Sequence, residues 1–250
     1  MSRILTRITP FLIPAYAAIK TAALLILIFT GLSLANEETP WDRKAPFEQA
    51  VISYTIQGAE TGSETLYIRN YGLEQASYHR TSSTLSGTLT ETNTVEITTP
   101  NWIYTYDLIS ETGEKTVNPT RFLIEAYRSL SPEEQKTVWA NAKKVGPSIL
   151  EDISSAMEQN ADMILGFSCD RTRMTETTVY TLHGTDIVLK TEGSIMNQAY
   201  SMTATAIEKI PVPDKVFKHP RNIMPELVTE SETMAREMAM QVMEVLKGNP

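Results

Sequence analysis

The chain has few of the residues on which catalytic and metal sites depend. It contains one cysteine, Cys169, and three histidines that stand singly, His79, His183 and His219. A single cysteine excludes an intramolecular disulfide. The sequence has no HExxH, no CxxC pair and no glycine-rich phosphate loop. No motif therefore predicts a metal site, a cofactor or a catalytic residue, and we expect a protein that is not an enzyme.

Positive charge is also scarce. The chain carries 22 Lys and Arg against 30 Asp and Glu, a formal net charge of −8 at pH 7. Nucleic acid and anionic membrane surfaces repel such a chain, so neither is an expected partner.

No apolar run reaches the roughly twenty residues that span a bilayer as a helix. Residues 21–34 near the start carry no charge. They follow the basic residues Arg3, Arg7 and Lys20 and lead into Ala35. Residues 1–35 are therefore predicted to be an export signal, cleaved between Ala35 and Asn36. The expected location is the periplasm. If the signal is not cleaved, it becomes an inner-membrane anchor, which would be the chain's only contact with the membrane.

After a polar leader at 36–46, period-2 alternation predicts antiparallel strands. Gly and Pro separate these segments at the short intervals typical of hairpins, and residues 182–185 form a predicted tight turn. The predicted strands cover residues 49–57, 64–71, 75–81, 92–98, 101–108, 163–171, 175–182, 185–191 and 198–208.

Helical signals interrupt the strands and return at the end of the chain. Asn118-Pro119 predicts a helix start, and Ser131 with Glu134 forms a capping-box pattern. A third short helix is predicted from Ser148 through Met157. The last helix is predicted over 225–247, with an apolar stripe of Leu227, Met234, Met238, Val242 and Val245. The sequence thus indicates one α+β domain at 47–221, followed by a C-terminal amphipathic helix within 222–250.

Two groups of residues leave alternatives open. Cys169 is either a small apolar residue packed on the sheet, a thiol nucleophile, or a partner in a disulfide between chains. Trp102, Tyr104 and Tyr106 share one face of a strand, where they line either an apolar cleft or an ordinary core. If the chain binds a ligand, we predict a cavity wall made of Tyr54, Trp102, Tyr104, Tyr106 and Met238.

The order of elements, a strand meander, a helical excursion and a second strand block, resembles the periplasmic lipoprotein-carrier (LolA/LolB-like) superfamily. It is most similar to a periplasmic family with a G-x-x-C strand motif. The segments that carry the resemblance are Ile164-Leu165-Gly166-Phe167-Ser168-Cys169-Asp170, residues 185–192, residues 204–207, residues 210–217 and His219-Pro220.

This resemblance implies a curved antiparallel half-barrel, with helices on its concave face and an apolar cavity for acyl chains. The long C-terminal helix is additional to that pattern. The leading hypothesis is a periplasmic, non-enzymatic binding or carrier protein for a lipid-like, acylated or amphipathic ligand. One alternative is a module that senses or binds another envelope protein through the same scaffold. A hydrolase using Cys169 is the third hypothesis.

Overall fold

The computed structural model describes residues 38–42, 44–84, 87–145, 156–174 and 176–248. The chain divides into two parts, residues 1–38 and 39–250, and the following description concerns the second part alone. The predicted export signal and its cleavage site lie outside the described residues. Within the described ranges, no helix combines the length and the apolar character needed to cross a membrane.

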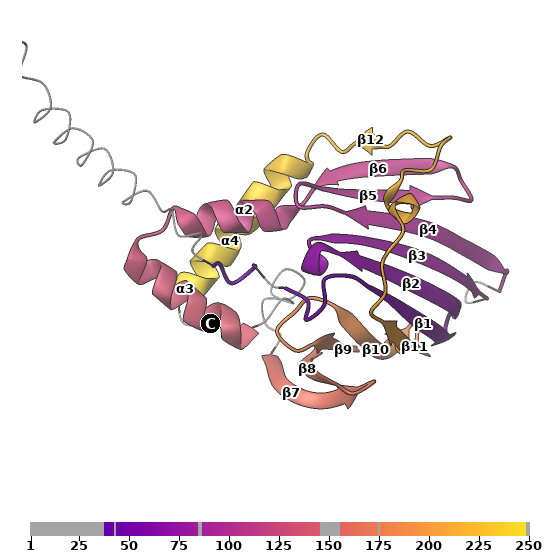
Figure 1. Ribbon diagram of the computed structural model, residues 1–250, viewed down its shortest axis with the longest axis horizontal. Helices are drawn as coiled ribbons and strands as arrows, with labels where there is room; N and C mark the ends of the chain where they lie inside the picture. Colours follow the sequence, from indigo (N-terminus) through magenta and orange to yellow (C-terminus); the bar gives the residue numbers. More distant parts are fainter. Residues whose placement is uncertain (1–37, 43, 85–86, 146–155, 175, 249–250) are drawn as a thin grey trace, which may run out of the picture. The chain divides into compact units, whose positions relative to one another are not determined.

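Twelve strands form one curved sheet in the order β12-β6-β5-β4-β3-β2-β1-β11-β10-β9-β8-β7 (Figure 1). All neighbours are antiparallel except the short β12, which runs parallel to β6. The strands are β1 (Ala50–Gly58), β2 (Thr61–Arg69), β3 (Glu74–Ser83), β4 (Thr90–Thr98), β5 (Trp102–Asp107), β6 (Thr112–Val117), β7 (Ala156–Ile164), β8 (Phe167–Arg173), β9 (Thr177–Leu182), β10 (Val188–Ile195), β11 (Gln198–Glu208) and β12 (Glu226–Leu227).

Three helices accompany the sheet: α2 (Pro119–Arg128), α3 (Pro132–Val145) and α4 (Ser231–Lys247). The predicted caps are confirmed. The Asn118 side chain accepts a hydrogen bond from the Thr120 backbone N–H at 3.0 Å. Ser131 and Glu134 exchange the two bonds of a capping box. Each cap satisfies N–H groups that the first helical turn leaves without a partner.

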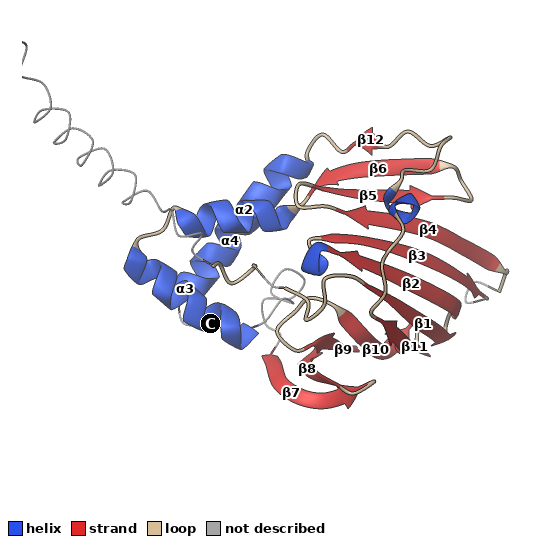
Figure 2. Cartoon of the chain, viewed as in Figure 1, coloured by secondary structure: helices blue, strands red, loops and turns tan. Residues whose placement is uncertain are grey.

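The helices pack on one another and gather at one end of the strands (Figure 2). α4 also contacts β6, and α3 contacts β7. Their shared apolar cluster contains Leu123 of α2, Val138 of α3 and Leu246 of α4, each almost fully buried. The predicted fold class is confirmed: an α+β protein with a large curved, mostly antiparallel sheet and a C-terminal helix.

Several predicted segments are wrong. The segment 163–171 is not one strand, because the chain turns at Leu165 and Gly166 between β7 and β8. Gly166 has a φ of +82°, which glycine adopts at little cost. Met157, assigned to a helix, lies in β7. The rest of that predicted helix falls mostly on residues 146–155, which lie outside the described ranges.

The C-terminal helix begins later than predicted and is rotated. It starts at Ser231, and residues 226–227 form β12 instead. Its buried side chains are Ala235, Ala239, Val242, Met243 and Leu246. Met234 of the predicted stripe is 60% exposed. The contact face is turned by about 100°, the angle between successive helical residues.

Most of the predicted polar leader at 36–46 packs onto the domain. Thr39 is buried, and the Trp41 ring lies edge-on to Tyr127 of α2 at 6.0 Å. Ala45 and Phe47 are buried in the cluster over β1 and β2. This segment therefore contributes to the core of the domain.

Candidate functional site

The strand register separates two faces of the sheet. Directly paired residues point to the same side, and successive residues along a strand point to opposite sides. Through β1–β5 the register runs Tyr54↔Glu64↔His79↔Thr94↔Asp107. Asp107 points to the opposite side of the sheet from Tyr104 and Tyr106, because it lies an odd number of residues from each of them along β5. We call the two sides the Tyr54 face and the Tyr104 face.

The Tyr104 face of β2–β6 is covered by the chain's own residues 209–225, which we call the strap. The Tyr106 hydroxyl bonds to the His219 ring, and the Tyr104 ring lies 4.6 Å from the same ring. The Tyr78 hydroxyl donates to the Val216 carbonyl at 2.9 Å. Tyr106 is fully buried, and burial raises its pKa to about 12. The aromatic residues of this face are therefore core.

Charged and close contacts hold the strap in place. Arg69 pairs with Asp214 at 2.8 Å, and its guanidinium lies 4.2 Å from the centre of the Phe217 ring. A Cβ on Gly113 would lie 2.8 Å from the Tyr106 ring and 3.1 Å from Ile223. Glycine at position 113 thus lets the ring and the strap approach the backbone of β6.

The five predicted ligand-binding residues do not line one cavity. Trp102, Tyr104 and Tyr106 share a face as predicted, but Tyr54 lies on the opposite face. Trp102 packs beside the helical cluster, with the Lys115 ammonium 3.7 Å from its ring centre. Met238 is half-buried on α4. Of the five, only Tyr54 lines the groove described next.

That groove lies on the Tyr54 face and consists of two hollows that share Gln75 and Asp186. The inner hollow has a volume of about 210 Å³ and is lined by Tyr54, Glu64, Leu66, Gln75, Ser77, Glu96, Asp186, Ile187, Val188 and Met202. The outer hollow, about 170 Å³, is lined by Trp41, Asp42, Gly72, Leu73, Gln75, Thr98, Pro100, Asn118, Thr120, Arg121, Ile124 and Asp186. Together they fall within the lower part of the roughly 300–1,000 Å³ typical of small-molecule sites.

The lining of the inner hollow is part apolar and part acidic. Leu66 and Ile187 are buried, and Met202 is half-buried. The same lining contains Glu64, whose carboxylate contacts the His79 ring at 3.0 Å, and Glu96. The Glu96 side chain remains accessible to solvent, yet the surrounding walls desolvate it and raise its pKa. The carboxylate is therefore well placed for a hydrogen-bond donor or a cation.

Tyr54 of β1 is bonded to the first residue of β10 and forms part of the groove wall. Its hydroxyl donates to the Val188 carbonyl at 2.8 Å, and only 3% of the residue is exposed. Burial holds its pKa far above the usual range, so the phenol stays neutral. The ring of Tyr54 therefore gives the groove apolar surface, and its hydroxyl holds the start of β10 in place.

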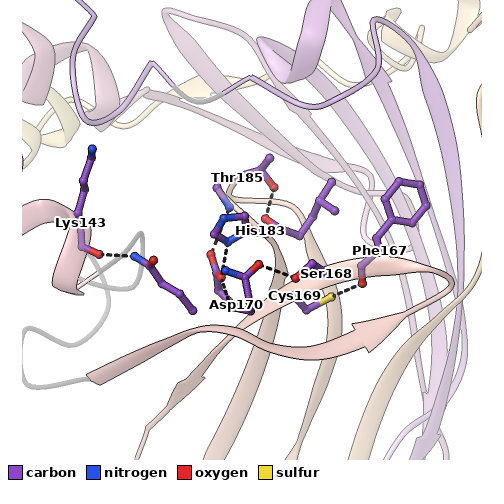
Figure 3. Close-up of polar contacts among 11 residues, drawn as sticks. Lys143, Phe167, Ser168, Cys169, Asp170, His183 and Thr185 are labelled. Atoms are coloured by element: carbon purple, nitrogen blue, oxygen red, sulfur yellow. Dashed lines mark hydrogen bonds and ion pairs between the residues drawn. The ribbon is translucent and has the colours of Figure 1, made fainter.

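Cys169 is in a poor position for catalysis. It is fully buried in the cluster over β1, β2 and β8–β11, and burial raises the pKa of its thiol. Its Sγ contacts the Phe167 carbonyl at 3.5 Å (Figure 3). The neighbouring Asp170, which holds His183, points to the other side of β8 because side chains alternate. This is the arrangement expected of a packed cysteine.

The three histidines have separate surroundings: His79 contacts Glu64, His183 contacts Asp170 and His219 contacts Tyr106. In the part of the chain that the structure describes, no group of three His, Cys, Asp or Glu side chains could hold a metal ion. The Asp170–His183 pair was missed from the sequence. The register of β8 on β9, in which Cys169 pairs with Leu182, brings the two residues together.

The sequence matches no protein-family model and no curated protein. Solved structures give weak likenesses. An uncharacterized conserved protein from Thermus thermophilus is 10% identical, with a TM-score of 0.36, over 84% of this chain and 98% of that one. LprF from Mycobacterium bovis is 8% identical, with a TM-score of 0.28, over 66% and 88%. The LolA superfamily protein NE2245 from Nitrosomonas europaea is 6% identical, with a TM-score of 0.24, over 71% and 93%.

Proposed function

We propose that this protein is a non-enzymatic binding or carrier protein that holds an amphipathic, lipid-like ligand in the groove on the Tyr54 face. The observation that carries the proposal is the inner hollow, whose lining combines apolar side chains with carboxylates. A ligand with an apolar chain and a polar end satisfies both sides. An entirely apolar ligand would desolvate Glu96 without giving it a partner, which is costly.

The ligand's apolar part packs on Leu66, Ile187 and Met202. Burial of apolar surface contributes roughly 25 cal/mol per Å². The polar end lies toward Glu64 and Glu96. The residues that line this hollow include Asp186 as a third carboxylate and no Lys or Arg. A positively charged or hydrogen-bond-donating head group is therefore favoured over an anionic one.

We also propose that the protein works outside the cytoplasm, in the periplasm. Support comes from the basic start of the chain, the uncharged run 21–34 and the small residues at Ser33 and Ala35. Expression of the full chain in a bacterium, followed by N-terminal sequencing of the periplasmic fraction, should find Asn36 first. Recovery of a chain starting at Met1 in the membrane fraction would instead identify an anchor. Recovery in the cytoplasm would contradict export.

The binding proposal is tested with two amphiphiles of equal chain length and opposite charge, decylamine and decanoate. We expect titration calorimetry to give one saturable site, with decylamine at least about tenfold tighter, equivalent to about 1.4 kcal/mol. Met202→Glu should abolish binding, because it places a charge on the apolar wall. The matched control is Met196→Glu at a hairpin turn, where the methionine is 76% exposed.

Native mass spectrometry of the exported protein tests the same proposal without a chosen probe. A bound small molecule that is present in the wild type and in Met196→Glu, and lost in Met202→Glu, supports it. Absence of any bound mass, together with no uptake of either amphiphile, would contradict the proposal. So would equal binding by the two methionine variants.

A further inference from the structure

A second hollow, outside the groove on the Tyr54 face, has a volume of about 400 Å³. It lies between the segment 39–44, helix α3, strands β7 and β8, and the turn after β9. Its lining is Thr39, Pro40, Asp42, Lys44, Trp139, Ala142, Lys143, Met157, Gln159, Asp170, His183 and Gly184. Among these residues, only Asp42 also lines the groove.

One wall of this hollow carries a histidine whose orientation is fixed. The Asp170 carboxylate has only 4% of its side chain exposed. It accepts hydrogen bonds from His183 Nδ1 at 2.6 Å, the Asn160 N–H at 2.9 Å and the Gly184 N–H at 3.2 Å (Figure 3). Because Nδ1 faces Asp170, the Nε2 atom of the ring is left for a ligand. The His183 side chain is 44% exposed.

The two carboxylates and the two ammonium groups of the lining differ in the partners that they have within the protein. Both carboxylates already serve the backbone: Asp170 as described, and Asp42 by accepting the Thr39 N–H at 2.7 Å. Lys44 and Lys143 form no ion pair with any residue that the structure describes. Two ammonium groups without an ion pair are therefore left to bind a ligand in this hollow. An anion is the ligand that such a lining attracts.

The other wall is apolar. Trp139 and Met157 are half-buried and Ala142 is buried. The Lys143 ammonium lies 5.2 Å from the centre of the Trp139 ring, so a charged group and an aromatic surface adjoin. A flat apolar group can stack on that ring while an attached anion reaches the lysine.

From these contacts we infer that the hollow is a second binding site, for a small molecule in which an anionic group adjoins an aromatic part. Lys143 and Lys44 bind the anion, His183 adds an Nε2–H donor when both of its ring nitrogens carry a proton, and Trp139 packs on the ring. Asp170 is a positioning residue that orients His183. The site is independent of the proposed carrier function, and its ligand has the opposite charge.

The test uses the full exported protein and phenyl phosphate as the probe, with the histidine ring resonances followed by NMR. We expect saturable shifts at His183, no shifts at His79, and no binding of benzylammonium. Lys143→Gln should weaken binding at least about tenfold, the usual effect of losing one charge-assisted bond. The control Lys218→Gln removes an exposed lysine of the strap and should leave the affinity unchanged.

Asp170→Asn separates the positioning role from simple loss of charge. It should weaken phenyl phosphate binding while the decylamine affinity of the groove stays as in the wild type, which shows that the variant is folded. The inference is overturned if the His183 shifts do not saturate, if His79 shifts equally, or if Lys143→Gln binds as tightly as Lys218→Gln. None of these outcomes depends on whether the groove binds decylamine.

Discussion

Successive side chains of strands β2–β5 point to opposite faces of the sheet, and these two faces have different surroundings. The Tyr104 face carries Ala76, Val95, Ile97 and Tyr106, all buried beneath the strap. The Tyr54 face of the same strands carries Ser77 and Glu96, and it is open as a groove. A row of aromatic residues therefore marks the side that the chain covers for itself, and the mixed side is the one left for a ligand.

The two faces differ in the free energy of covering them with the chain's own residues. The aromatic face releases water from apolar surface when the strap packs on it, and the tyrosine hydroxyls find partners in His219 and Val216. The strap supplies no comparable partner for Glu96 on the opposite side. Covering Glu96 with apolar residues would leave a charged carboxylate with only the long hydrogen bond from the Thr98 hydroxyl, at 3.4 Å.

The largest expected effect that tests this comparison is that of Tyr106→Ala. The substitution empties a fully buried site and removes the partner of His219. By the usual range for large aromatic deletions, it should lower the free energy of unfolding by about 3–5 kcal/mol. Urea denaturation measures it.

The neighbouring Thr105→Ala is the matched control, because Thr105 is exposed on the Tyr54 face of the same strand. It should cost less than about 1 kcal/mol. Similar losses in the two variants would mean that the strap does not cover the Tyr104 face as described.

Much of the fold was predictable, because the signals that determine it are local. The alternation through 49–57 and the caps at Asn118 and Ser131 act over a few residues, and the elements they predict are present. Strand β6 was missed because Thr112–Val117 is mostly polar and shows little alternation. The turn at Leu165-Gly166 was missed because both flanks have the alternation of a strand.

The candidate site was far less predictable. Alternation correctly put Trp102, Tyr104 and Tyr106 on one face, but it cannot say whether that face is covered. The answer depends on residues more than a hundred positions away, such as His219. The inner hollow likewise needs Asp186 and Ile187, which approach β2 and β4 only through the tertiary fold.

A second, smaller effect compares two tyrosine hydroxyls, one for each face. Tyr54 donates to the Val188 carbonyl from a buried position, and Tyr78 donates to the Val216 carbonyl from a half-buried one. Tyr54→Phe should cost about 1–2 kcal/mol, because it leaves a carbonyl without a partner away from water. Tyr78→Phe should cost less, because water can replace the lost donor. Thermal denaturation of both variants checks this order, and a larger loss for Tyr78→Phe would contradict the assignment of Tyr54 to the better buried wall.

The smallest effect concerns Glu96 and has a defined pH dependence. Desolvation raises the pKa of Glu96 in the folded state, so the folded protein disfavours the ionised carboxylate. Below the unfolded-state pKa of Glu, the protonated Glu96 makes its full contribution to the free energy of unfolding. That contribution is lost as the pH rises through the raised folded-state pKa. Glu96→Gln should therefore raise the melting temperature at pH 7, and the gain should fade toward pH 4.

The control is Glu91→Gln, which changes an exposed carboxylate of β4 outside the groove and should show no such gain. If Glu96→Gln lowered the melting temperature at pH 7, the carboxylate would already have a stabilising partner within the protein, and it would not be available to a ligand in the groove.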